Sequence, residues 1–371
     1  MVVDLPLGRR IELARRRRGL SRQTLGGLIG RSSEWIRQVE REERSVDRLS
    51  VLLALARVLR VGDIGGFLGS ALPQAAPLPP PDTRVGPLRD LLYAPAPLPV
   101  TAADQDRRAL DSATAAWTGS ERPYYEALRQ LPPILIEVPG DELAAGAYRL
   151  AAEVLRHLDE LPLSLLAAER AVAAARRHGE PLGEAESIRG FAETLLRLRH
   201  PAQAQRLCLD AVTALRARRP ESDAAGGDAL GGLYLTAAEG AIVDGDHAAG
   251  VHLMGTARLA ARRPETEAQV VRLTLLLGRT RPALRLAETV DAEAIAGRSA
   301  RARHYITVAR AHAGEDSPEA VVFALGKAEI ACAEELRFNT DARSTIRDLL
   351  ERPNALIRAD VLALAERCGL L

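Results

Sequence analysis

The chain of 371 residues contains 47% hydrophobic, 27% charged and only 3% aromatic residues, which are the proportions of a globular protein and exclude a disordered chain. No apolar run reaches the roughly 18 residues of a membrane span, and the N-terminus lacks the apolar core of a signal peptide, so the sequence predicts a cytoplasmic protein. The net charge is +1, but residues 1–62 carry 14 Arg and 7 acidic residues and stand at +7, which leaves −6 for the rest. This asymmetry predicts a polyanionic partner for the first part only.

Four short helices are predicted within residues 7–61 from the spacing of their apolar residues. Ser21 is expected to cap the second helix, because a serine oxygen accepts hydrogen bonds from the free N–H groups at a helix start. Either Ser32 or Ser33 caps the third helix by the same argument, and the fourth begins near Ser45.

A linker is predicted at residues 67–100, between a first domain at residues 1–66 and a second at residues 101–371. Nine prolines lie between Ala71 and Val100, and proline removes backbone donors and fixes φ, so this stretch is expected to be extended. A short amphipathic helix from Leu88 to Tyr93 is expected to interrupt it and dock on a neighbouring domain.

The second domain is predicted to be a helical repeat, because helical segments alternate with short breaks. Five breaks recur at spacings of 35–46 residues, as in stacked helical hairpins: Leu161-Pro162, His200-Pro201, Asp246-His247, Arg281-Pro282 and Ser317-Pro318. Small residues that let two helices approach closely occur at matching offsets in two units: Ala192, Ala204, Cys208 and Ala211, against Ala238, Gly250, Met254 and Ala257. The pattern resembles the tetratricopeptide repeat, although the outer units fit unclassified hairpins equally well. Residues 355–368 are predicted to form a closing helix, and the whole chain is predicted to be all-α.

The first domain carries a pattern with a physical reason at each position: Leu20-Ser21, Leu25, Gly26, Ile29, Gly30, Ile36, Val39 and Glu40. Gly26 leaves room where the second helix crosses the third, and Gly30 makes a tight turn in which positive φ is cheap only for glycine. The pattern resembles the helix-turn-helix domain of the phage-repressor-like regulators of the xenobiotic response element family, in the form seen in actinobacterial members. The resemblance implies that Glu40 is a buried acid that pairs with Arg15 of the first helix.

The resemblance also implies a DNA-reading surface, because in such domains the third helix enters the major groove. It makes four residues of this helix candidate base readers: Ser33, Glu34, Arg37 and Gln38. Four further residues are candidate phosphate contacts: Arg22, Gln23, Ser32 and Arg41. Trp35 is larger than the usual residue at its position, and either packs against the fourth helix or presses on the DNA backbone.

Regulators that combine such a domain with tetratricopeptide repeats commonly dimerise through the repeats and bind a small signalling molecule or a peptide on the concave face. The resemblance makes six residues candidate ligand contacts: Tyr148, Arg189, Glu193, Tyr234, Arg272 and Tyr305. The alternative is that the three tyrosines pack between adjacent hairpins. Asn339 and Asn354 are the only asparagines, which weakens the case for a peptide, because peptide-sensing relatives often hold the peptide backbone with asparagines.

No catalytic, metal or cofactor site is predicted. Cys208, Cys332 and Cys368 are odd in number and form no CxxC pair, so buried free thiols are expected. Phosphate-binding, dinucleotide-binding, nucleophile-elbow and metal-ligand motifs are all missing, which argues against an enzyme.

Two functions of different classes follow from these patterns. The first is a transcriptional regulator that binds a double-stranded DNA operator as a homodimer and is modulated by a small molecule, a peptide or a protein partner. The second is an interaction scaffold in which the repeat domain carries the function and DNA binding is secondary. Arginine and glutamine on the predicted reading helix favour the first, because both can read base edges.

Overall fold

The computed structural model describes residues 5–44, 46, 49–59, 61, 82–94, 104–136, 140–219, 224–352, 354 and 356–371. These residues form helices and contain no β-strand, which confirms the predicted all-α class. Contacts between Cα atoms divide the chain into two compact units, one of Met1–Pro77 with Tyr305–Leu371 and one of Leu78–His304. The bounds of the three predicted segments remain a prediction.

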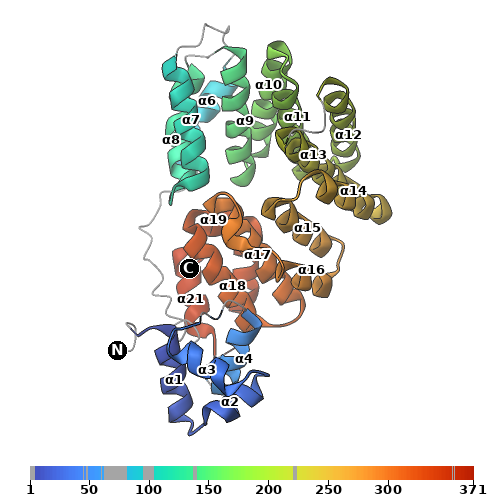
Figure 1. Ribbon diagram of the computed structural model, residues 1–371. Helices are drawn as coiled ribbons and strands as arrows, with labels where there is room; N and C mark the ends of the chain where they lie inside the picture. Colours follow the sequence, from blue (N-terminus) through green and yellow to red (C-terminus); the bar gives the residue numbers. More distant parts are fainter. Residues whose placement is uncertain are drawn as a thin grey trace. The chain divides into compact units, whose positions relative to one another are not determined.

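The first four helices form a small domain around one apolar core (Figure 1). They are α1 (Leu7–Arg17), α2 (Arg22–Leu28), α3 (Ser33–Glu40) and α4 (Leu49–Leu59). Helix α3 contacts α1 and α2, and α4 contacts the same two helices. The core consists of side chains from all four helices: Ile11, Leu25, Ile36, Val39, Val51, Leu55 and Leu59. The predicted start of the fourth helix near Ser45 lies outside the described residues.

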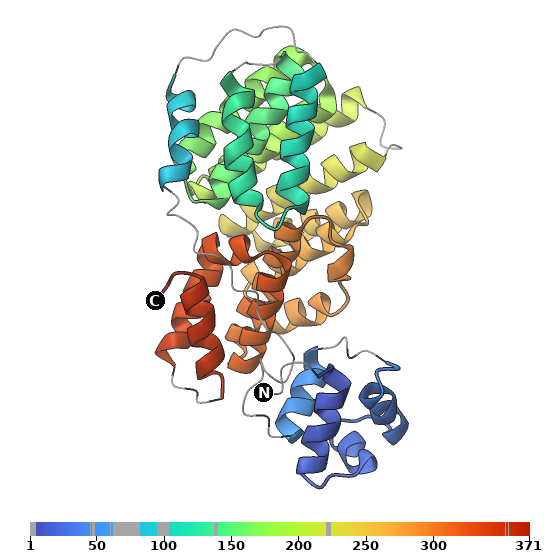
Figure 2. The same ribbon diagram turned by 90° about the vertical axis from the view of Figure 1, so that its left-hand side faces the viewer.

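Helix α6 (Asp82–Tyr93) confirms the predicted helix within the proline-rich segment and begins six residues earlier than expected. It contacts α8 and α10, and Figure 2 shows it in light blue beside the green helices. Its C-terminal carbonyls accept hydrogen bonds from Arg170, whose Nη2 lies 2.8 Å from the carbonyl oxygens of both Leu92 and Ala94. The helix is therefore docked, as predicted. Apart from Ala94, the other residues of the predicted linker lie outside the described ranges.

Helical hairpins make up the rest of the 78–304 unit and continue beyond it. Every predicted break lies within two residues of the start of the second helix of a hairpin. Four of the five breaks contain a proline, which fits the first turn of a helix because its missing N–H has no partner to lose there. At the fifth, the side chain of Asp246 caps α14 instead. The helices of the 78–304 unit are α7 (Asp104–Gly119), α8 (Pro123–Ile136), α9 (Asp141–His157), α10 (Leu161–His178), α11 (Pro181–Arg197), α12 (Pro201–Arg218), α13 (Ala224–Val243), α14 (His247–Ala260), α15 (Pro264–Leu276), α16 (Thr280–Ala287) and the short 3-10 helix η1 (Ala292–Ala294).

The C-terminal part of the chain continues the series. Helix α17 (Arg298–Gly314) spans the boundary of the two units, and the helices after it are α18 (Pro318–Ala331), α19 (Ala333–Phe338), α20 (Thr340–Glu351) and α21 (Arg358–Arg367). Helix α21 confirms the predicted closing helix and contacts α18 and α20.

The turns at the five predicted breaks share one backbone geometry. In each turn the second residue after the first helix has a positive φ of 51–94°, and these residues are Asp159, Arg199, Gly245, Gly278 and Asp316. The next residue donates its N–H to a carbonyl five residues earlier, at 2.9 Å from Glu160 to Leu155 and 2.8 Å from Asp246 to Ala241. This bond satisfies a carbonyl that the helix end leaves free. The repeat is therefore structural as well as periodic, although only two of the five positions carry glycine.

Within the 78–304 unit the hairpins stack so that their first helices form one layer. Helix α9 contacts α11, α11 contacts α13, and α13 contacts α15, while α10, α12 and α14 each contact the helices next to them in the chain. This arrangement is the solenoid expected from the period of the breaks. The tetratricopeptide identity of the repeats remains a prediction.

Close packing between the helices depends on small residues, as predicted. All four residues from Ala192 to Ala211 in the first matched set are buried, and so are their counterparts in the second. A Cβ on Gly250 would lie 2.5 Å from Cγ1 of Ile242, so no side chain fits there. Most of the solenoid core is built in this way from alanine and leucine.

The three cysteines are buried and free, as expected. Burial raises the pKa of Cys368 to about 12 and raises that of Cys208 further. None of the described helices combines the length and apolar character needed to cross a bilayer. No cluster of metal-ligating side chains occurs among the described residues.

Candidate nucleic-acid interface and repeat-domain groove

The turn between α2 and α3 is held by local chemistry. Ser21 and Ser32 cap the two helices, with Oγ accepting from the N–H of Thr24 at 3.0 Å and of Trp35 at 3.1 Å. Gly30 has a φ of +68°, and a Cβ on Gly26 would lie 2.6 Å from the Arg31 carbonyl oxygen. Both glycines therefore occupy places that no other residue fits without strain. These geometries confirm the predicted roles of the two glycines and of the two caps.

A buried carboxylate ties the first three helices together. Glu40 at the end of α3 accepts from Arg15 of α1 at 2.5 and 3.2 Å and from Arg22 of α2 at 2.7 Å. The pairing of Arg15 with Glu40 is thus confirmed. A third nitrogen of Arg15 donates to the carbonyl of Leu20 at 2.7 Å. Since Glu40 and Arg15 are almost fully buried, these contacts fix the orientation of α3 relative to α1 and α2.

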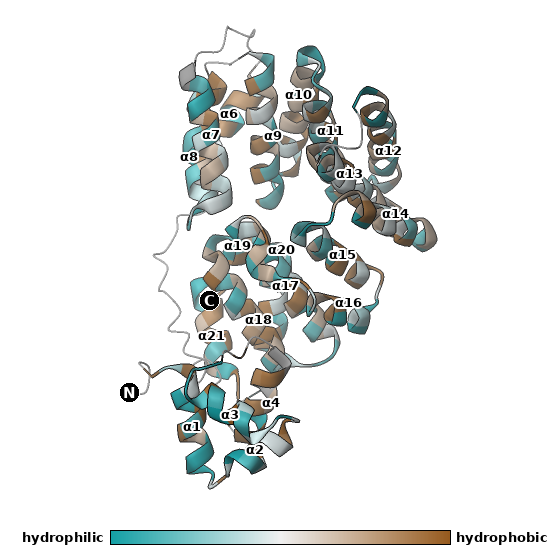
Figure 3. Ribbon diagram, in the orientation of Figure 1, coloured by the Kyte–Doolittle hydropathy of each residue, from teal (hydrophilic) through white to brown (hydrophobic). Residues whose placement is uncertain are grey.

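The outer face of α3 carries the predicted base readers. Ser33 and Glu34 are exposed, whereas Arg37 and Gln38 are half-buried on the same helix, of which Ile36 faces the core. Arg37 donates to the carboxylates of Glu34 and Glu43. In Figure 3 much of the ribbon of α1 and α3 is teal, the colour of hydrophilic residues.

These ion pairs shift the pKa values of their partners. The hydrogen bond from Arg37 lowers the pKa of Glu34 below its ordinary value of 4.5, so the carboxylate is ionised at neutral pH. Hydrogen bonds to Glu34 and then Glu43 raise the pKa of Arg37. Glu34 and Arg37 are therefore both charged at neutral pH on the outer face of the domain.

The predicted phosphate contacts differ in how free their side chains are. Gln23 and Arg41 are exposed. Ser32 is exposed too, but its oxygen already caps α3, and the guanidinium of Arg22 is engaged by Glu40. Arg22 and Ser32 thus carry structural roles, and their contacts with phosphate remain a prediction.

Trp35 packs against the apolar core of the domain, which includes residues of α4. Its ring also lies under the guanidinium of Arg31, at 5.7 Å from the ring centroid. Of the two alternatives for Trp35, the structure favours packing.

The six residues predicted to contact a ligand in the repeat domain all lie on first helices of hairpins: Tyr148 on α9, Arg189 and Glu193 on α11, Tyr234 on α13, Arg272 on α15 and Tyr305 on α17. Their environments differ, however. Tyr148 and Tyr234 are each only 6% exposed.

Each of the three tyrosine rings lies beside a cation of a neighbouring second helix. The distances from the cation to the ring centroid are 5.7 Å for Arg170 and Tyr148, 5.6 Å for Arg216 and Tyr234, and 5.9 Å for Lys327 and Tyr305. Tyr148 is thus buried beside a cation of its own hairpin, and Tyr234 beside a cation of the preceding hairpin, which for Tyr234 favours the alternative of packing between adjacent hairpins.

The predicted charged residues form ion pairs between neighbouring first helices. Glu193 accepts from Arg156 of α9 at 2.6 Å and from Arg189 at 2.5 Å, and Arg272 of α15 pairs with Glu239 of α13. Burial raises the pKa of Glu193, but the positive charges of Arg189, Arg156 and Arg272 outweigh this effect and hold the pKa below its ordinary value. The Glu193 carboxylate is therefore ionised at neutral pH and bridges α9 and α11.

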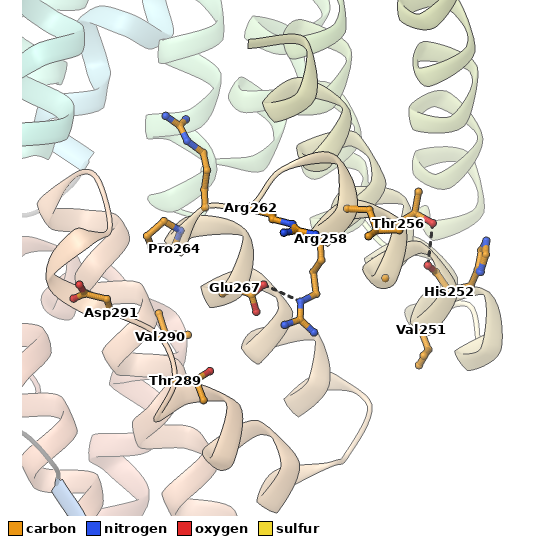
Figure 4. Close-up of a pocket in the computed structure, with 13 residues that line it drawn as sticks. Val251, His252, Thr256, Arg258, Arg262, Pro264, Glu267, Thr289, Val290 and Asp291 are labelled. Atoms are coloured by element: carbon orange, nitrogen blue, oxygen red, sulfur yellow. Dashed lines mark hydrogen bonds and ion pairs between the residues drawn. The ribbon is translucent and has the colours of Figure 1, made fainter. Parts of the chain in front are cut away.

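An open groove with a volume of about 910 Å³ lies elsewhere in the same unit, and the predictions did not include it (Figure 4). One wall is the outer face of α14, with His252, Thr256 and Leu259, and the opposite wall is formed by the start of α15 and residues 289–291. Leu259 is 77% exposed. The Nε of Arg258 donates to Glu267 across the groove at 2.8 Å. The feature of the sequence that could have indicated this groove is the pair of arginines at positions 262 and 263, directly before Pro264.

Comparison with known proteins gives one family match. Residues 6–64 match the model of a helix-turn-helix domain family. A search of curated protein sequences gave no match.

Several solved structures are similar at a low level. The apo form of the competence regulator ComR from Streptococcus vestibularis is 14% identical, with 86% of this chain and 99% of that chain covered and a TM-score of 0.33. PlcR from Bacillus thuringiensis, solved with the peptide PapR7 and DNA, is 12% identical, with 93% and 99% covered and a TM-score of 0.29. At these values the likeness transfers no function. The family match and the geometry of α2 and α3 together show that the chain begins with a helix-turn-helix domain.

Proposed function

We propose that this protein is a sequence-specific DNA-binding transcriptional regulator that reads the major groove with α3. The observation that carries this proposal is the two-sided character of α3. Its inner face is locked by Ile36, Val39 and the buried Glu40, while its outer face presents Arg37 and Gln38. Guanidinium and amide groups match the hydrogen-bonding pattern of guanine and adenine in the major groove.

The charge of the domain supports the same function. Residues 1–62 stand at +7, and this surplus attracts the DNA backbone whatever its sequence. In this proposal the phosphate contacts come from α2 and from the two ends of α3, namely from Gln23, Ser32 and Arg41. Arg22 also contacts phosphate and, in addition, holds Glu40 in place. Phosphate contacts set the register of α3 on the duplex, and base contacts set the sequence.

Selection of a binding sequence tests the proposal directly. Full-length protein is used to enrich a duplex from a randomised pool, and its affinity for that duplex and for a scrambled one is measured by fluorescence anisotropy at several salt concentrations. Arg37→Ala and Gln38→Ala are each expected to lose about 1–3 kcal/mol of discrimination. Arg57→Ala, which removes an exposed arginine of α4, is the charge-matched control and is expected to keep it.

The proposal fails if no sequence is enriched and folded protein does not bind any duplex at low salt. Equal loss of discrimination in the Arg57→Ala control would also contradict it, because reading would then not depend on α3. In both cases the scaffold function would take its place.

The repeat domain is proposed to dimerise the protein and to take an effector. Two-fold symmetric subunits would place two α3 helices on half-sites about 34 Å apart, or a multiple of that distance. The expected result is a two-fold symmetric enriched sequence and a dimer in analytical ultracentrifugation. A monomer bound to a single half-site would contradict this part of the proposal.

The groove beside α14 supports an effector site, because it is open and its volume lies in the range of small-molecule sites. The predicted residues Arg189, Glu193 and Arg272, by contrast, are engaged in ion pairs with protein partners. The test is a screen of metabolite and peptide pools for compounds that shift the affinity for the selected duplex. An Arg262→Glu variant is expected to keep its affinity for the duplex but to lose the shift that the compound causes. If the compound shifts the affinity of this variant as it does for the wild type, the groove is not the effector site.

A further inference from the structure

Arg37, the proposed guanine reader, has both hydrogen-bonding edges of its guanidinium occupied. Its Nε and Nη2 donate to Glu34 at 2.9 and 2.6 Å, and its Nη1 and Nη2 donate to Glu43 at 3.2 and 3.0 Å. A bidentate contact with guanine needs two neighbouring N–H groups of one such edge. In this conformation neither edge is available to a base.

The two carboxylates reach Arg37 in different ways. Glu34 lies one turn earlier on α3, so its position follows from helical spacing. Glu43 lies beyond the end of α3 and is brought back by Glu42, which has a positive φ of 61°. The N–H of Glu43 then donates to the carbonyl of Gln38 at 2.9 Å and fixes this reversal. The second pair is thus a product of the helix end.

The ion pairs of Arg37 with Glu34 and Glu43 are weak enough for a DNA base to replace one of them. The side chains of Glu34 and Glu43 are 58% and 45% exposed, and ion pairs at such positions are weak because water screens them. A non-specific complex held by phosphate contacts leaves both pairs intact. A specific complex, in which Arg37 donates two hydrogen bonds to a guanine, has to break one of the two ion pairs.

We propose that Glu43 tunes the DNA specificity of this protein by competing with guanine for one edge of Arg37. This inference rests on the proposed function and names a residue outside the predicted reading surface. Glu43 is the carboxylate that is displaced, because Glu34 lies on the reading face itself and can turn to a cytosine amino group. Removal of Glu43 therefore favours the specific complex over the non-specific one.

The test compares Glu43→Gln with Glu42→Gln in the full-length protein. Both variants remove one negative charge next to α3, and Glu42 has no ion pair or hydrogen bond from its side chain among the described residues, so it controls for the general gain in attraction to DNA. Affinity is measured for the selected duplex and for the scrambled duplex. Glu43→Gln is expected to raise the ratio of the two affinities about two- to fivefold over Glu42→Gln.

A second comparison shows whether the effect passes through Arg37. In an Arg37→Ala background, Glu43→Gln and Glu42→Gln are expected to give the same ratio. If the two variants already agree in the wild-type background, or if Glu43→Gln lowers the ratio, the competition is excluded. If the wild-type protein does not prefer the selected duplex at all, the proposed function itself fails. The two failures are therefore distinguishable, because the first leaves the wild-type preference and its loss in Arg37→Ala intact.

Discussion

Arg15 and Glu40, 25 residues apart in the sequence, form a buried ion pair with an Nε–Oε1 distance of 2.5 Å in the interior of the helix-turn-helix domain. The exposed fractions of their side chains are 10% and 1%. Because Glu40 also accepts from Arg22, one carboxylate holds α1 and α2 against the end of the proposed reading helix.

Replacing Glu40 by Ala is expected to destabilise this domain by about 3–5 kcal/mol, because Arg15 would be left buried without its partner. Hydrogen exchange of the amides of α1 to α3 in the full-length protein measures the loss. Glu42→Ala, at an exposed position nearby, is expected to change the unfolding free energy of the domain by less than about 0.5 kcal/mol. Similar exchange in both variants would show that the buried pair contributes no more than a surface charge.

Two adjacent glycines of α2 are expected to respond in opposite ways to alanine. Gly26→Ala places a Cβ 2.6 Å from the Arg31 carbonyl oxygen and is expected to cost about 1–3 kcal/mol. Gly27 has nothing within 4 Å of its Cβ position, so Gly27→Ala is expected to stabilise α2 by about 0.5–1 kcal/mol. Chemical denaturation followed by Trp35 fluorescence, in a Trp117→Phe background, measures both, and effects of the same sign would contradict the close approach of α2 to the turn.

The hairpin turns offer a second matched pair. Arg199 has a φ of +67° and no hydrogen bond or ion pair from its side chain among the described residues, so Arg199→Gly is expected to relieve about 1 kcal/mol of backbone strain. Gly245 occupies the same place in another turn with a φ of +94°, and Gly245→Ala is expected to destabilise by a similar amount. Hydrogen exchange of α11 to α14 distinguishes the two, and a destabilising Arg199→Gly would argue against strain at this turn.

The ion pairs of Glu193 predict how stability depends on pH. The pKa of Glu193 is lower in the folded protein than its ordinary value of 4.5, so the unfolded chain binds more protons between the two values. The stabilising contribution of Glu193 is therefore present above about pH 4.5 and lost as the pH falls through the folded pKa. The gap in unfolding free energy between wild type and Glu193→Gln is expected to narrow as the pH falls from about 7 to 3.

Glu169→Gln is the control for this experiment, because Glu169 is exposed and has no ion pair among the described residues. Its gap to the wild type is expected to stay constant over the same pH range. A gap that is also constant for Glu193→Gln would mean that the bridge between α9 and α11 contributes nothing to stability at neutral pH.

Features that depend only on residues close together in the sequence could be predicted from it. Ser21 and Gly30 act within one turn of their own positions, through a cap and through a positive φ, so their roles do not depend on the rest of the chain. Pro201 and Pro318 mark helix starts for the same reason, since proline lacks only an N–H that the first turn leaves free. The all-α class, the helix-turn-helix domain and the starts of the second helices therefore followed from local chemistry.

The tertiary structure decided what depends on residues far apart or on the end of an element. Arg37 was predicted as a candidate base reader without any ion partner being foreseen. The chain reversal at Glu42 brings Glu43 onto its guanidinium, and no local rule places a glutamate in a positive-φ turn. Tyr148 was a candidate for an open face, yet it is buried, with Arg170 of the next helix over its ring. A periodic pattern gives the face of a helix on which a residue lies, whereas the packing of other helices decides whether that face stays open.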